Sequence, residues 1–576
     1  MPASASSNRF GPRIEADGVA FQLWAPSARE ADVLLGEQQI SLSKDASGFW
    51  SGKANAAPGD LYRLRVNGQE VPDPASRFQP NDVFGPSQIV DASSYVWRND
   101  DWRGRPWQEA VIYELHTGVM GGFDGVRARL ADLAALGVTA IELMPIADFG
   151  GARNWGYDGV LPFAPDSAYG APDALRALVD EAHGLGLMVF LDVVYNHFGP
   201  EGNWLPAYVP EMFDEAAHTP WGAAIDFHKS PVRQFFIENA LYWLEDFRFD
   251  GLRLDAVHAI LDRSFLVELA KVVRERITGR HVHLVVENEA NDAALLGEGF
   301  DAQWNDDFHN VVHVLLTGET HAYYQDFADQ PARRLARCLS DGFIYQGESS
   351  PNHDGKPRGE PSKGLSPTHF ISFLQNHDQV GNRAFGERLT TLVSPQALRA
   401  AMALLLLSPQ IPMLFMGEEV GAREPFLFFT DFHGALGKAV REGRRKEFAK
   451  APGFADPATR DRIPDPNAPE TLAASLWTDQ APDAAEWCAL ISRLIKLRRE
   501  LIIPHLKGCK AIGAEAVGDK AVLASWRLGD GAALALAINL GETDVPAQPP
   551  ALPPIYGEAS QPTFLPALTT LAWIVR

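Results

Sequence analysis

Three apolar runs of this chain each end in an acidic residue, and their carboxylates are the side chains best placed to do chemistry. The runs are Gly251-Leu-Arg-Leu-Asp255, Leu284-Val-Val-Glu287 and Phe370-Ile-Ser-Phe-Leu-Gln-Asn-His-Asp378. Cleavage of a glycosidic bond uses two carboxyl groups at one pocket, one that protonates the leaving oxygen and one that meets the developing cation. The pattern therefore indicates a sugar-cleaving enzyme whose acids stand at the ends of successive strands.

The three acids suggest different roles. Asp255 follows Arg253 by two positions, so strand alternation puts both side chains on one side. The guanidinium favours the ionised carboxylate that a nucleophile needs; alone, the two would be read as a structural ion pair. Glu287 is the expected general acid, which then activates water, although Glu289 lies two residues on and could face the same way. Asp378 is expected to bind sugar hydroxyls and to stabilise the cationic transition state.

Other polar and aromatic residues are expected around the same sugar ring. His197 and His377 end strand-like runs and can donate hydrogen bonds, with a purely structural role as the alternative. Tyr157 is a candidate stacking platform, whereas its neighbour Trp155 could equally pack in the core. The predicted substrate-binding residues are Tyr157, Asp192, His197, Arg253, His258, Trp304 and His377.

The elements that must position these residues alternate between strands and helices from residue 104 onward. Apolar residues at 126, 130, 133 and 136 share one helical face, and 173–183 is the next helix. Eight repeated units of this kind favour a closed parallel (β/α)₈ barrel, an α/β fold that carries its catalytic groups at the carboxyl ends of the strands. The eight expected strands are 111–115, 139–144, 188–194, 251–255, 283–287, 300–304, 369–374 and 411–415.

Two β-rich regions flank the expected barrel of residues 104–503. Residues 1–96 show short alternating runs and the hairpin signal Asn67-Gly68, which predicts an N-terminal β-sandwich of the carbohydrate-binding-module kind. Residues 504–576 follow a last helix at 485–501 and predict a small C-terminal β-domain. The Gly-, Pro- and Ser-rich stretch 342–368 is expected to be a long loop on or beside the catalytic face.

Composition excludes several classes of function. At 576 residues the chain is too long for one core. A net charge of −23 argues against nucleic acid or an anionic membrane as partner. The three cysteines show no disulfide or metal-ligand spacing, and we expect no cofactor.

The expected location follows from two segments of the chain. Residues 1–18 lack an export-like apolar segment. Segment 400–416 is too short to span a bilayer and is typical of a buried helix followed by a strand. A cytoplasmic location is therefore expected.

The acids belong to a recognisable set of motifs. Asp192-Val-Val-Tyr-Asn-His197, Gly251-Leu-Arg-Leu-Asp255, the strand ending at Glu287 and Asn376-His-Asp378 resemble the four signature regions of the α-amylase superfamily, glycoside hydrolase family 13. The resemblance implies a retaining mechanism through a covalent glycosyl intermediate. It also implies that Asp255 is the nucleophile, Glu287 the acid/base and Asp378 the transition-state stabiliser.

A closer resemblance is to the malto-oligosyltrehalose trehalohydrolase family, and it covers most of the chain. It implies hydrolysis of the α-1,4 bond next to the terminal trehalose unit of maltooligosyl trehalose, in functional pairing with a synthase that makes that substrate. Glu289 matches a second acid in this family, which supports Glu287 as the catalytic one, and no calcium site is implied. The segments that carry the resemblance are 154–163, 303–309, 373–383, 415–419 and 426–431.

Two other functions compete with this interpretation. A 1,4-α-glucan branching enzyme with similar domains would transfer a chain to a 6-hydroxyl instead of to water, but segments 303–309 and 426–431 favour the hydrolase. A catalytically inactive glycogen-binding or scaffold protein would not need three intact acids, and all three are present.

Overall fold

A closed parallel barrel forms the centre of the computed structural model, which describes residues 9–219, 221–478, 480–558 and 563–576. Its strands follow one another in chain order, and the last pairs with the first, with Met413 opposite Ile112. The predicted (β/α)₈ barrel and all eight predicted strands are confirmed. The strands are β10 (Ile112–Leu115), β11 (Ala140–Leu143), β14 (Met188–Val193), β17 (Gly251–Leu254), β18 (His283–Val286), β19 (Ala302–Trp304), β22 (Phe370–Ser372) and β23 (Ile411–Phe415).

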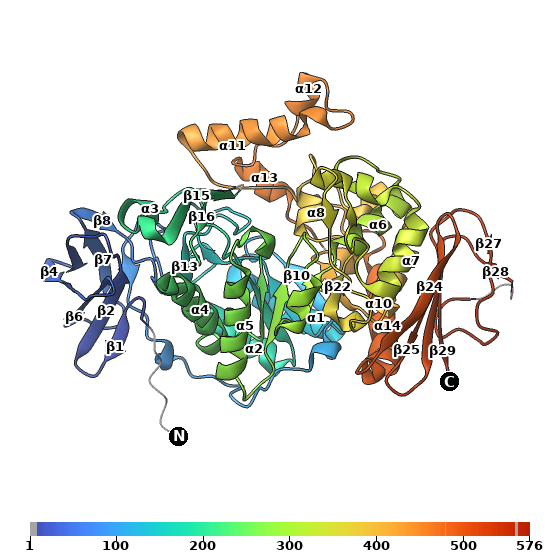
Figure 1. Ribbon diagram of the computed structural model, residues 1–576, viewed down its shortest axis with the longest axis horizontal. Helices are drawn as coiled ribbons and strands as arrows, with labels where there is room; N and C mark the ends of the chain where they lie inside the picture. Colours follow the sequence, from blue (N-terminus) through green and yellow to red (C-terminus); the bar gives the residue numbers. More distant parts are fainter. Residues whose placement is uncertain (1–8, 220, 479, 559–562) are drawn as a thin grey trace.

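Helices surround the barrel (Figure 1), and local sequence explains where several begin and end. Proline stands in the first turn of α2, α4, α7 and α10, where its missing N–H costs nothing. Gly137 ends α1 with a φ of 105°, a conformation that favours glycine. The surrounding helices are α1 (Gly122–Leu136), α2 (Pro172–Gly184), α4 (Ser230–Glu245), α5 (Arg263–Arg276), α6 (Asp306–Thr317), α7 (Pro331–Asp341), α10 (Pro395–Leu407) and α14 (Ala484–Leu497).

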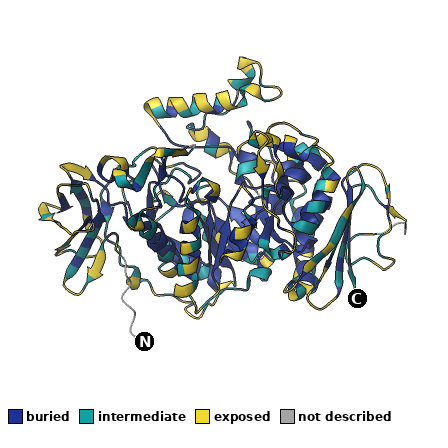
Figure 2. Ribbon diagram, in the orientation of Figure 1, coloured by how far each residue is buried: buried dark blue, intermediate teal, exposed yellow. Residues whose placement is uncertain are grey.

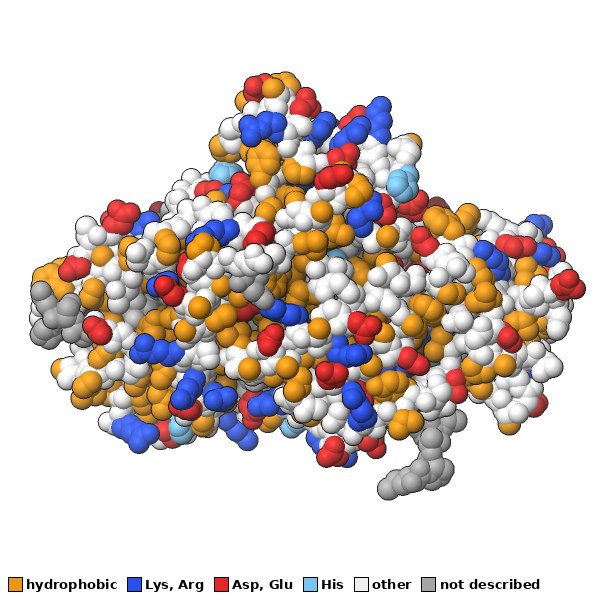
Figure 3. All heavy atoms as spheres, turned by 180° about the vertical axis from the view of Figure 1, so that it is seen from behind, with side chains coloured by type: hydrophobic (Ala, Val, Ile, Leu, Met, Phe, Trp, Pro, Cys, Tyr) orange, Lys and Arg blue, Asp and Glu red, His pale blue; other side chains and the backbone are white. Residues whose placement is uncertain are grey.

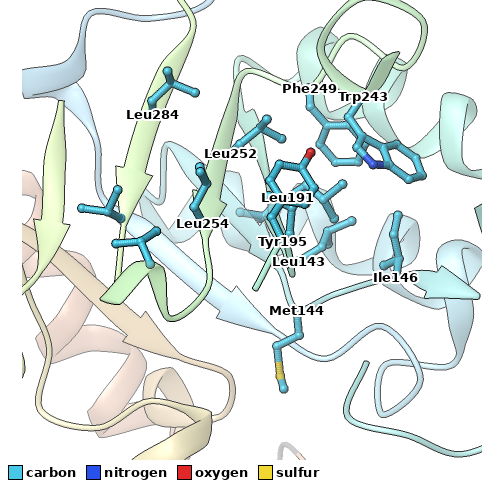
Figure 4. Packing of buried hydrophobic residues seen from close by; sticks show 14 of the residues in the cluster. Leu143, Met144, Ile146, Leu191, Tyr195, Trp243, Phe249, Leu252, Leu254 and Leu284 are labelled. Carbon is cyan, nitrogen blue, oxygen red and sulfur yellow. The ribbon is translucent and has the colours of Figure 1, made fainter. Parts of the chain in front are cut away.

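The core on the outside of the barrel strands is made of alternate, apolar strand residues. Figure 4 shows Leu191 and Leu252 lying near Phe249, which follows α4, and Trp243 of that helix beside Phe249, whereas Leu254 lies further toward Leu284. All six side chains are at most 1 % exposed. The strands are correspondingly dark in Figure 2. Alternation therefore assigns one set of side chains to the helical layer and leaves the other set for the interior of the barrel.

The interior of the barrel is apolar at the amino ends of the strands and polar at their carboxyl ends. Ile112 and Phe190 belong to a separate buried apolar cluster that fills the amino end. Two residues further along the same strands stand Glu114 and Asp192, and Arg253 lies opposite Asp192 on β17. Period-two alternation thus carries charged side chains to the end of the barrel where the catalytic acids were expected.

Antiparallel sheets occupy the two ends of the molecule, blue and red in Figure 1. At the N-terminal end, Asn67 and Gly68 adopt positive φ values of 51° and 82° in the predicted hairpin. We keep 1–96, 104–503 and 504–576 as the proposed domains; residues 1–8 of the first lie outside the described residues. The N-terminal sheets comprise β1 (Arg13–Glu15), β2 (Gly18–Trp24), β6 (Phe49–Ala54) and β5 (Ser43–Lys44), and β4 (Gln38–Ser41), β3 (Ala31–Leu35), β7 (Leu61–Val66), β8 (Gln69–Val71) and β9 (Ser87–Gln88).

The C-terminal sheet packs against helices of the barrel. Trp526 donates a hydrogen bond from Nε1 to the Leu339 carbonyl of α7 at 3.0 Å, and Thr570 Oγ1 donates one to the Ala400 carbonyl of α10 at 2.7 Å. The strands in sheet order are β24 (Lys510–Gly518), β25 (Ala521–Arg527), β26 (Ala533–Asn539) and β29 (Thr569–Val575), with β27 (Val545–Pro546) and β28 (Phe564–Leu565) forming a separate pair.

Further helices and strands lie at the carboxyl end of the barrel, and α11 and α12 project from the body (Figure 1). Stretch 342–368, predicted as a loop, is largely irregular and holds only short strands and turns. The short elements are α3 (Leu205–Tyr208), α8 (His377–Gly381), α9 (Leu389–Leu392), α11 (Gly434–Glu447), α12 (Pro457–Arg460), α13 (Pro469–Ala474), β12 (Ala147–Asp148), β13 (Leu161–Pro165), β15 (Phe213–Thr219), β16 (Gly222–Ile225), β20 (Glu348–Ser349) and β21 (Pro357–Arg358).

The seventh strand is present but shorter than the predicted strand 369–374. It ends at Ser372, and Asp378 lies in the first turn of α8 instead of at a strand end. The cause is Asn376, whose side-chain oxygen accepts hydrogen bonds from the backbone N–H groups of Asp378 (2.9 Å) and Gln379 (3.2 Å) and so begins a helix. The prediction that all three acids end strands is therefore wrong for the third acid.

The apolar segment 400–416 forms the end of α10 followed by β23, as predicted. In the part of the chain that the structure describes, no helix is both long and apolar enough to cross a membrane. On the face shown in Figure 3, acidic and basic side chains are interspersed.

Candidate active site

Arg253 is the side chain around which the predicted site is built. It is fully buried, and its Nη1 lies 2.6 Å from Asp192 Oδ2 and 2.9 Å from Asp255 Oδ1. Its Nη2 lies 2.9 Å from Glu287 Oε2. Burial opposes the charge of the guanidinium, but the carboxylates around it, Asp192 foremost, raise its pKa well above the usual range. One permanent cation therefore organises three carboxyl groups from three neighbouring strands.

Asp255 stands immediately after β17 with its side chain 11 % exposed. Its Oδ1 accepts from Arg253, and its Oδ2 accepts a hydrogen bond from Asn196 Nδ2 at 2.8 Å. The same amide nitrogen also bonds the Asp255 carbonyl at 2.9 Å. Two donors of fixed position thus orient a carboxylate that still reaches the surface, as an attacking group requires.

Glu287 follows β18, and its side chain is 18 % exposed. Its Oε2 accepts a hydrogen bond from the backbone N–H of Ala256 at 2.8 Å and lies beside Arg253. Ala256 adopts a left-handed φ of 40°, which is unfavourable for a residue with a Cβ atom. The backbone between the two acids is thus turned so that one of its N–H groups points at Glu287.

Asp378 is the most exposed of the three acids, at 36 % for the side chain. Its Oδ1 lies 3.5 Å from His377 Nε2 and accepts a hydrogen bond from Asn382 at 3.2 Å. His377 in turn donates from Nδ1 to Glu114 Oε1 at 2.5 Å. Burial lowers the pKa of the His377 ring, but the charges of Asp378 and Glu114 outweigh burial and raise it to about 9. The ring is therefore a cation at neutral pH.

Tyr157 and Asp192 lie between these groups. Tyr157 stacks on the His377 ring with centroids 5.1 Å apart and donates from its hydroxyl to Asp192 Oδ2 at 2.6 Å. Burial raises the pKa of the Asp192 carboxyl to about 7, although the Arg253 charge opposes this. Because Asp192 is only 2 % exposed, its position suits the support of Arg253 and Tyr157 better than contact with a ligand.

Two of the predicted substrate-binding residues are not exposed beside the catalytic acids. Trp304 is 1 % exposed and lies under the Arg253 guanidinium, with its ring centroid 4.0 Å from Cζ, so it cannot face a ligand. His258 is exposed on the 3-10 turn Val257–Ala259. Its Nε2 lies 3.8 Å from Glu289 Oε2, so its acidic neighbour is Glu289 and not one of the catalytic acids. Burial and the course of the turn depend on the packed barrel, which the sequence pattern does not describe.

Two cavities open beside the cluster. The first, which we call the histidine cavity, has a volume of about 520 Å³ and is lined by His197, Trp221 and residues of β15. His197 donates to the Tyr157 carbonyl at 2.9 Å, and burial lowers the pKa of the ring to about 4, so it is neutral at pH 7. The Trp221 ring stacks on His197 at 4.6 Å. Trp155, the alternative aromatic residue, is buried against Phe426.

The second cavity, which we call the carboxylate cavity, has a volume of about 240 Å³. Glu287, Asp378, Asp306 and Tyr323 line it, together with Arg358 from stretch 342–368. Arg358 donates to the Glu289 carbonyl at 2.9 Å and pairs with Asp307, which anchors that stretch beside the site. A sugar chain that reaches the acids therefore meets side chains from both sides of the barrel opening.

Several supporting residues were not identified from the sequence. Glu114 holds His377, Asn196 holds Asp255, and Asn376 caps the helix that carries Asp378. Asn196 and Asn376 stand inside recognised motifs, which is a signal that could have found them. Glu142 is 1 % exposed and neither carboxyl oxygen has a hydrogen-bond partner. Burial, together with the charges of Asp192 and Glu114, raises its pKa well above the usual range.

Among the described residues, no group of three or more His, Cys, Asp or Glu side chains is arranged to hold a metal ion. What the cluster can do is acid–base and nucleophilic chemistry. Asp255 is fixed by Arg253 and Asn196, whereas Glu287 and Asp378 reach into an open cavity. Paired carboxyl groups of this kind are the equipment of glycoside hydrolysis.

Comparison with known proteins agrees with this chemistry. Residues 97–221 match the family model "Alpha amylase, catalytic domain", and residues 509–569 match a domain of unknown function, DUF3459. A malto-oligosyltrehalose trehalohydrolase of Saccharolobus solfataricus is 43 % identical over 76 % of this chain and 80 % of its own length. A branching enzyme of Dechloromonas aromatica is 33 % identical over only 44 % of this chain and 46 % of its own.

The fold is shared with solved structures as well. A crystal structure from Salmonella typhimurium, described as a candidate alpha amylase, has a TM-score of 0.92 at 44 % identity and covers 98 % of this chain and 99 % of its own. The similarity therefore includes the sheets at both ends of the barrel.

Proposed function

The chain belongs to the malto-oligosyltrehalose trehalohydrolase family of α-amylase-type glycoside hydrolases, and from this premise we propose how its residues act. The enzyme hydrolyses the α-1,4-glucosidic bond next to the terminal trehalose unit of maltooligosyl trehalose. The products are trehalose and a maltooligosaccharide. The observation that carries the assignment of residues is the joint contact of Asp255 and Glu287 with the buried guanidinium of Arg253.

In the first step, Asp255 is the nucleophile and Glu287 the acid. The Glu287 proton passes to the glycosidic oxygen as that oxygen leaves with the trehalose unit. Asp255 Oδ2 or Oδ1 then forms a bond to the anomeric carbon, and the electron pair of the broken bond stays on the leaving oxygen. Arg253 Nη1 donates a hydrogen bond to Asp255 Oδ1 at 2.9 Å and so holds the attacking carboxylate in position.

In the second step, water replaces the enzyme oxygen. Glu287, now ionised, takes a proton from the water, whose oxygen attacks the anomeric carbon while the bond to Asp255 breaks. Two inversions at the same carbon retain its configuration. Asp378 stabilises the oxocarbenium-like transition state of the sugar. The protonated ring of His377 lies beside the Asp378 side chain and holds that side chain in position.

The substrate contacts that we propose are Tyr157 and His197. The Tyr157 ring, which stacks on His377, contacts the sugar beside the scissile bond, and the neutral His197 ring lines the histidine cavity with its Nε2–H donated to the Tyr157 carbonyl. Arg253 and Asp192 do not touch the substrate. Asp192 accepts hydrogen bonds from Arg253 and Tyr157 and so holds both, and Arg253 in turn holds Asp255. The cytoplasmic location and the pairing with a synthase that supplies trehalose-capped chains are proposals that rest on the sequence.

The test of this function is product analysis with maltotriosyl trehalose and maltopentaose as parallel substrates. The expected result is rapid release of trehalose from the first and much slower cleavage of the second. Fast cleavage of maltopentaose would indicate a general glucan hydrolase. A rise in the branch content of amylose would instead favour the branching enzyme, the second candidate, whose relatives match less of the chain.

A further inference from the structure

A third cavity, which we call the basal cavity, lies at the end of the barrel opposite the catalytic acids. Val111, directly before β10, and Thr139, directly before β11, line it at the amino ends of these strands. Its volume is about 450 Å³. Sites that bind small molecules have volumes of about 300–1,000 Å³. The basal cavity is therefore large enough for a small molecule, and none of the residues that line it takes part in the proposed reaction.

The basal cavity carries an excess of positive charge. Its lining includes three cations, Arg105, Arg499 and Lys507, and one acidic side chain, Glu109. Glu109 Oε2 lies 2.9 Å from Arg105 Nη2 and so compensates that guanidinium. Arg499 and Lys507 are exposed and have no acidic partner in the part of the chain that the structure describes. Because the chain as a whole carries a net charge of −23 and repels anions, two uncompensated cations in one cavity mark a place that attracts an anion.

Arg499 is presented to the basal cavity by a rare type of helix. Residues Arg498–Ile502 continue α14 as a π-helix, a form that is uncommon and frequent at functional sites. Arg498 is fully buried and anchors this turn, because its guanidinium donates hydrogen bonds to the carbonyls of Leu406 at 3.2 Å and Gln410 at 2.6 Å. With Arg498 held in the interior, the next side chain, that of Arg499, is exposed and lines the cavity.

The remaining walls of the basal cavity supply apolar surface and neutral polar groups. Ile495 of α14 and the turn residues Ile503 and Pro504 form an apolar wall, and Gln108 adds a side-chain amide. Arg105 is fixed on the other side because its Nη1 donates a hydrogen bond to the Gly186 carbonyl at 3.1 Å. Apolar walls with a few polar or charged groups are typical of sites for small organic molecules. The ligand that fits this lining is therefore an organic anion.

We propose that the basal cavity binds a small phosphate monoester, with the phosphate group on Arg499 and Lys507 and the organic part against the apolar wall. A phosphate monoester carries a charge of about −1.5 to −2 at neutral pH, which matches two uncompensated cations. A guanidinium donates two parallel hydrogen bonds to phosphate oxygens, and an ammonium group adds a point charge. A single carboxylate would neutralise only one of the two cations. The inference does not depend on the proposed function, because the catalytic acids lie at the other end of the barrel.

The test is calorimetric titration of the full-length protein with glucose 6-phosphate as the probe, in a buffer of low ionic strength that contains no phosphate. Saturating maltotriose is present to occupy the catalytic cleft. The expected result is one site per chain. Arg499→Ala and Lys507→Ala should each raise the Kd about tenfold, because a hydrogen bond to a charged group contributes an affinity of that order. Glucose should not bind under these conditions, and inorganic phosphate should bind more weakly than the probe because it makes no contact with the apolar wall.

The matched control is Arg527→Ala, which removes an exposed arginine at the end of β25 that does not line the basal cavity. Its Kd for the probe should stay within about twofold of that of the natural protein. Thermal unfolding of all variants identifies any loss of fold. The inference would be overturned by the absence of probe binding, or by an affinity that neither Arg499→Ala nor Lys507→Ala changes. Equal weakening in Arg527→Ala would overturn it as well, since net charge and not the cavity would then attract the probe.

Discussion

At the residue scale, the charge balance of the site depends on Arg253. It is the cation that touches Asp192, Asp255 and Glu287 together, and it has no access to solvent. Without it, three carboxyl groups would share a poorly hydrated space, and like charges at such distances disfavour ionisation. The arrangement separates the roles: Asp255 is clamped by two donors, whereas Glu287 keeps one oxygen for the leaving group.

Replacing Asp255 by Asn tests the proposed nucleophile. The amide is nearly the same size but cannot form the covalent intermediate, so kcat for trehalose release should fall by about 10⁴-fold or more. The measurement is the initial rate on maltotriosyl trehalose. Asp519→Asn, an exposed change between β24 and β25, is the control and should leave the rate unchanged. Turnover of Asp255→Asn near the natural rate would remove Asp255 from the mechanism.

Glu142 gives a pH-dependent prediction about stability. Its folded-state pKa is raised by burial, so the folded protein holds the Glu142 proton more tightly than the unfolded chain does. That contribution to stability is fully present below pH 4.5 and is lost as the pH rises toward the folded pKa. Glu142→Gln keeps the shape and has no proton to lose.

The variant should therefore unfold at the same temperature as the natural protein near pH 4.5 and at a higher temperature at pH 8, by about 2 °C or more. Thermal unfolding at the two pH values is the measurement. A variant that is less stable at pH 8 would show that the Glu142 charge is compensated in the fold.

At the element scale, helix α8 positions Asp378, which the sequence pattern had placed at the end of a strand. Asp378 lies in the first turn of the helix, near the N-terminal N–H groups that favour negative charge. The helix begins after Asn376 and is tied to β10 because Glu114 holds both the backbone N–H and the ring of His377. A helix of five residues has little stability of its own, so these contacts determine where Asp378 stands.

The cap of α8 is open to a direct test. Asn376→Ala removes the acceptor for two backbone N–H groups, which costs about 1 kcal/mol and releases the first turn. We expect kcat/KM to fall about tenfold or more, because small misplacements of catalytic groups cost up to about a hundredfold. Asn376→Asp is the matched control, since Asp caps helices as well as Asn. Equal loss in both variants would mean that the amide nitrogen of Asn376 matters, not the cap.

At the scale of the whole molecule, the sheets at both ends are joined to the barrel by buried contacts. Arg77 of the N-terminal region lies 4.5 Å from the ring centroids of Phe163 and Tyr242 in the barrel. At the other end, Trp526 of the C-terminal sheet is fully buried and bonded to α7. Neither contact reaches the acids, so the end sheets are expected to affect stability more than chemistry.

Trp526→Ala tests this separation. Removal of a buried tryptophan costs about 3–5 kcal/mol, so the thermal unfolding midpoint should fall by several degrees. The value of kcat/KM at 25 °C should stay within about twofold of the natural enzyme if the barrel is intact. Leu552→Ala, an exposed change in the same region, is the control. A loss of activity at 25 °C without a loss of stability would show that the C-terminal sheet shapes the site.

The sequence alone predicted the barrel and the positions of Asp255 and Glu287 directly after strands, because strand alternation and motif spacing are local properties. Side chains on one face of a strand recur every second residue, so the shared side of Arg253 and Asp255 followed from their spacing. The eight strands had the right order because parallel βα units add neighbours in sequence. The misplacement of Asp378 has a local cause too, since the cap at Asn376 competes with the strand pattern.

Only the tertiary structure decided which side chains meet and which are buried. Glu114 and His377 are 263 residues apart and touch only because the closed barrel brings β10 beside the segment after β22. The same closure buries Trp304 under Arg253 and leaves His258 and Tyr323 exposed. Contact partners and exposed fractions depend on the packing of distant segments, and no local pattern of residue types encodes them.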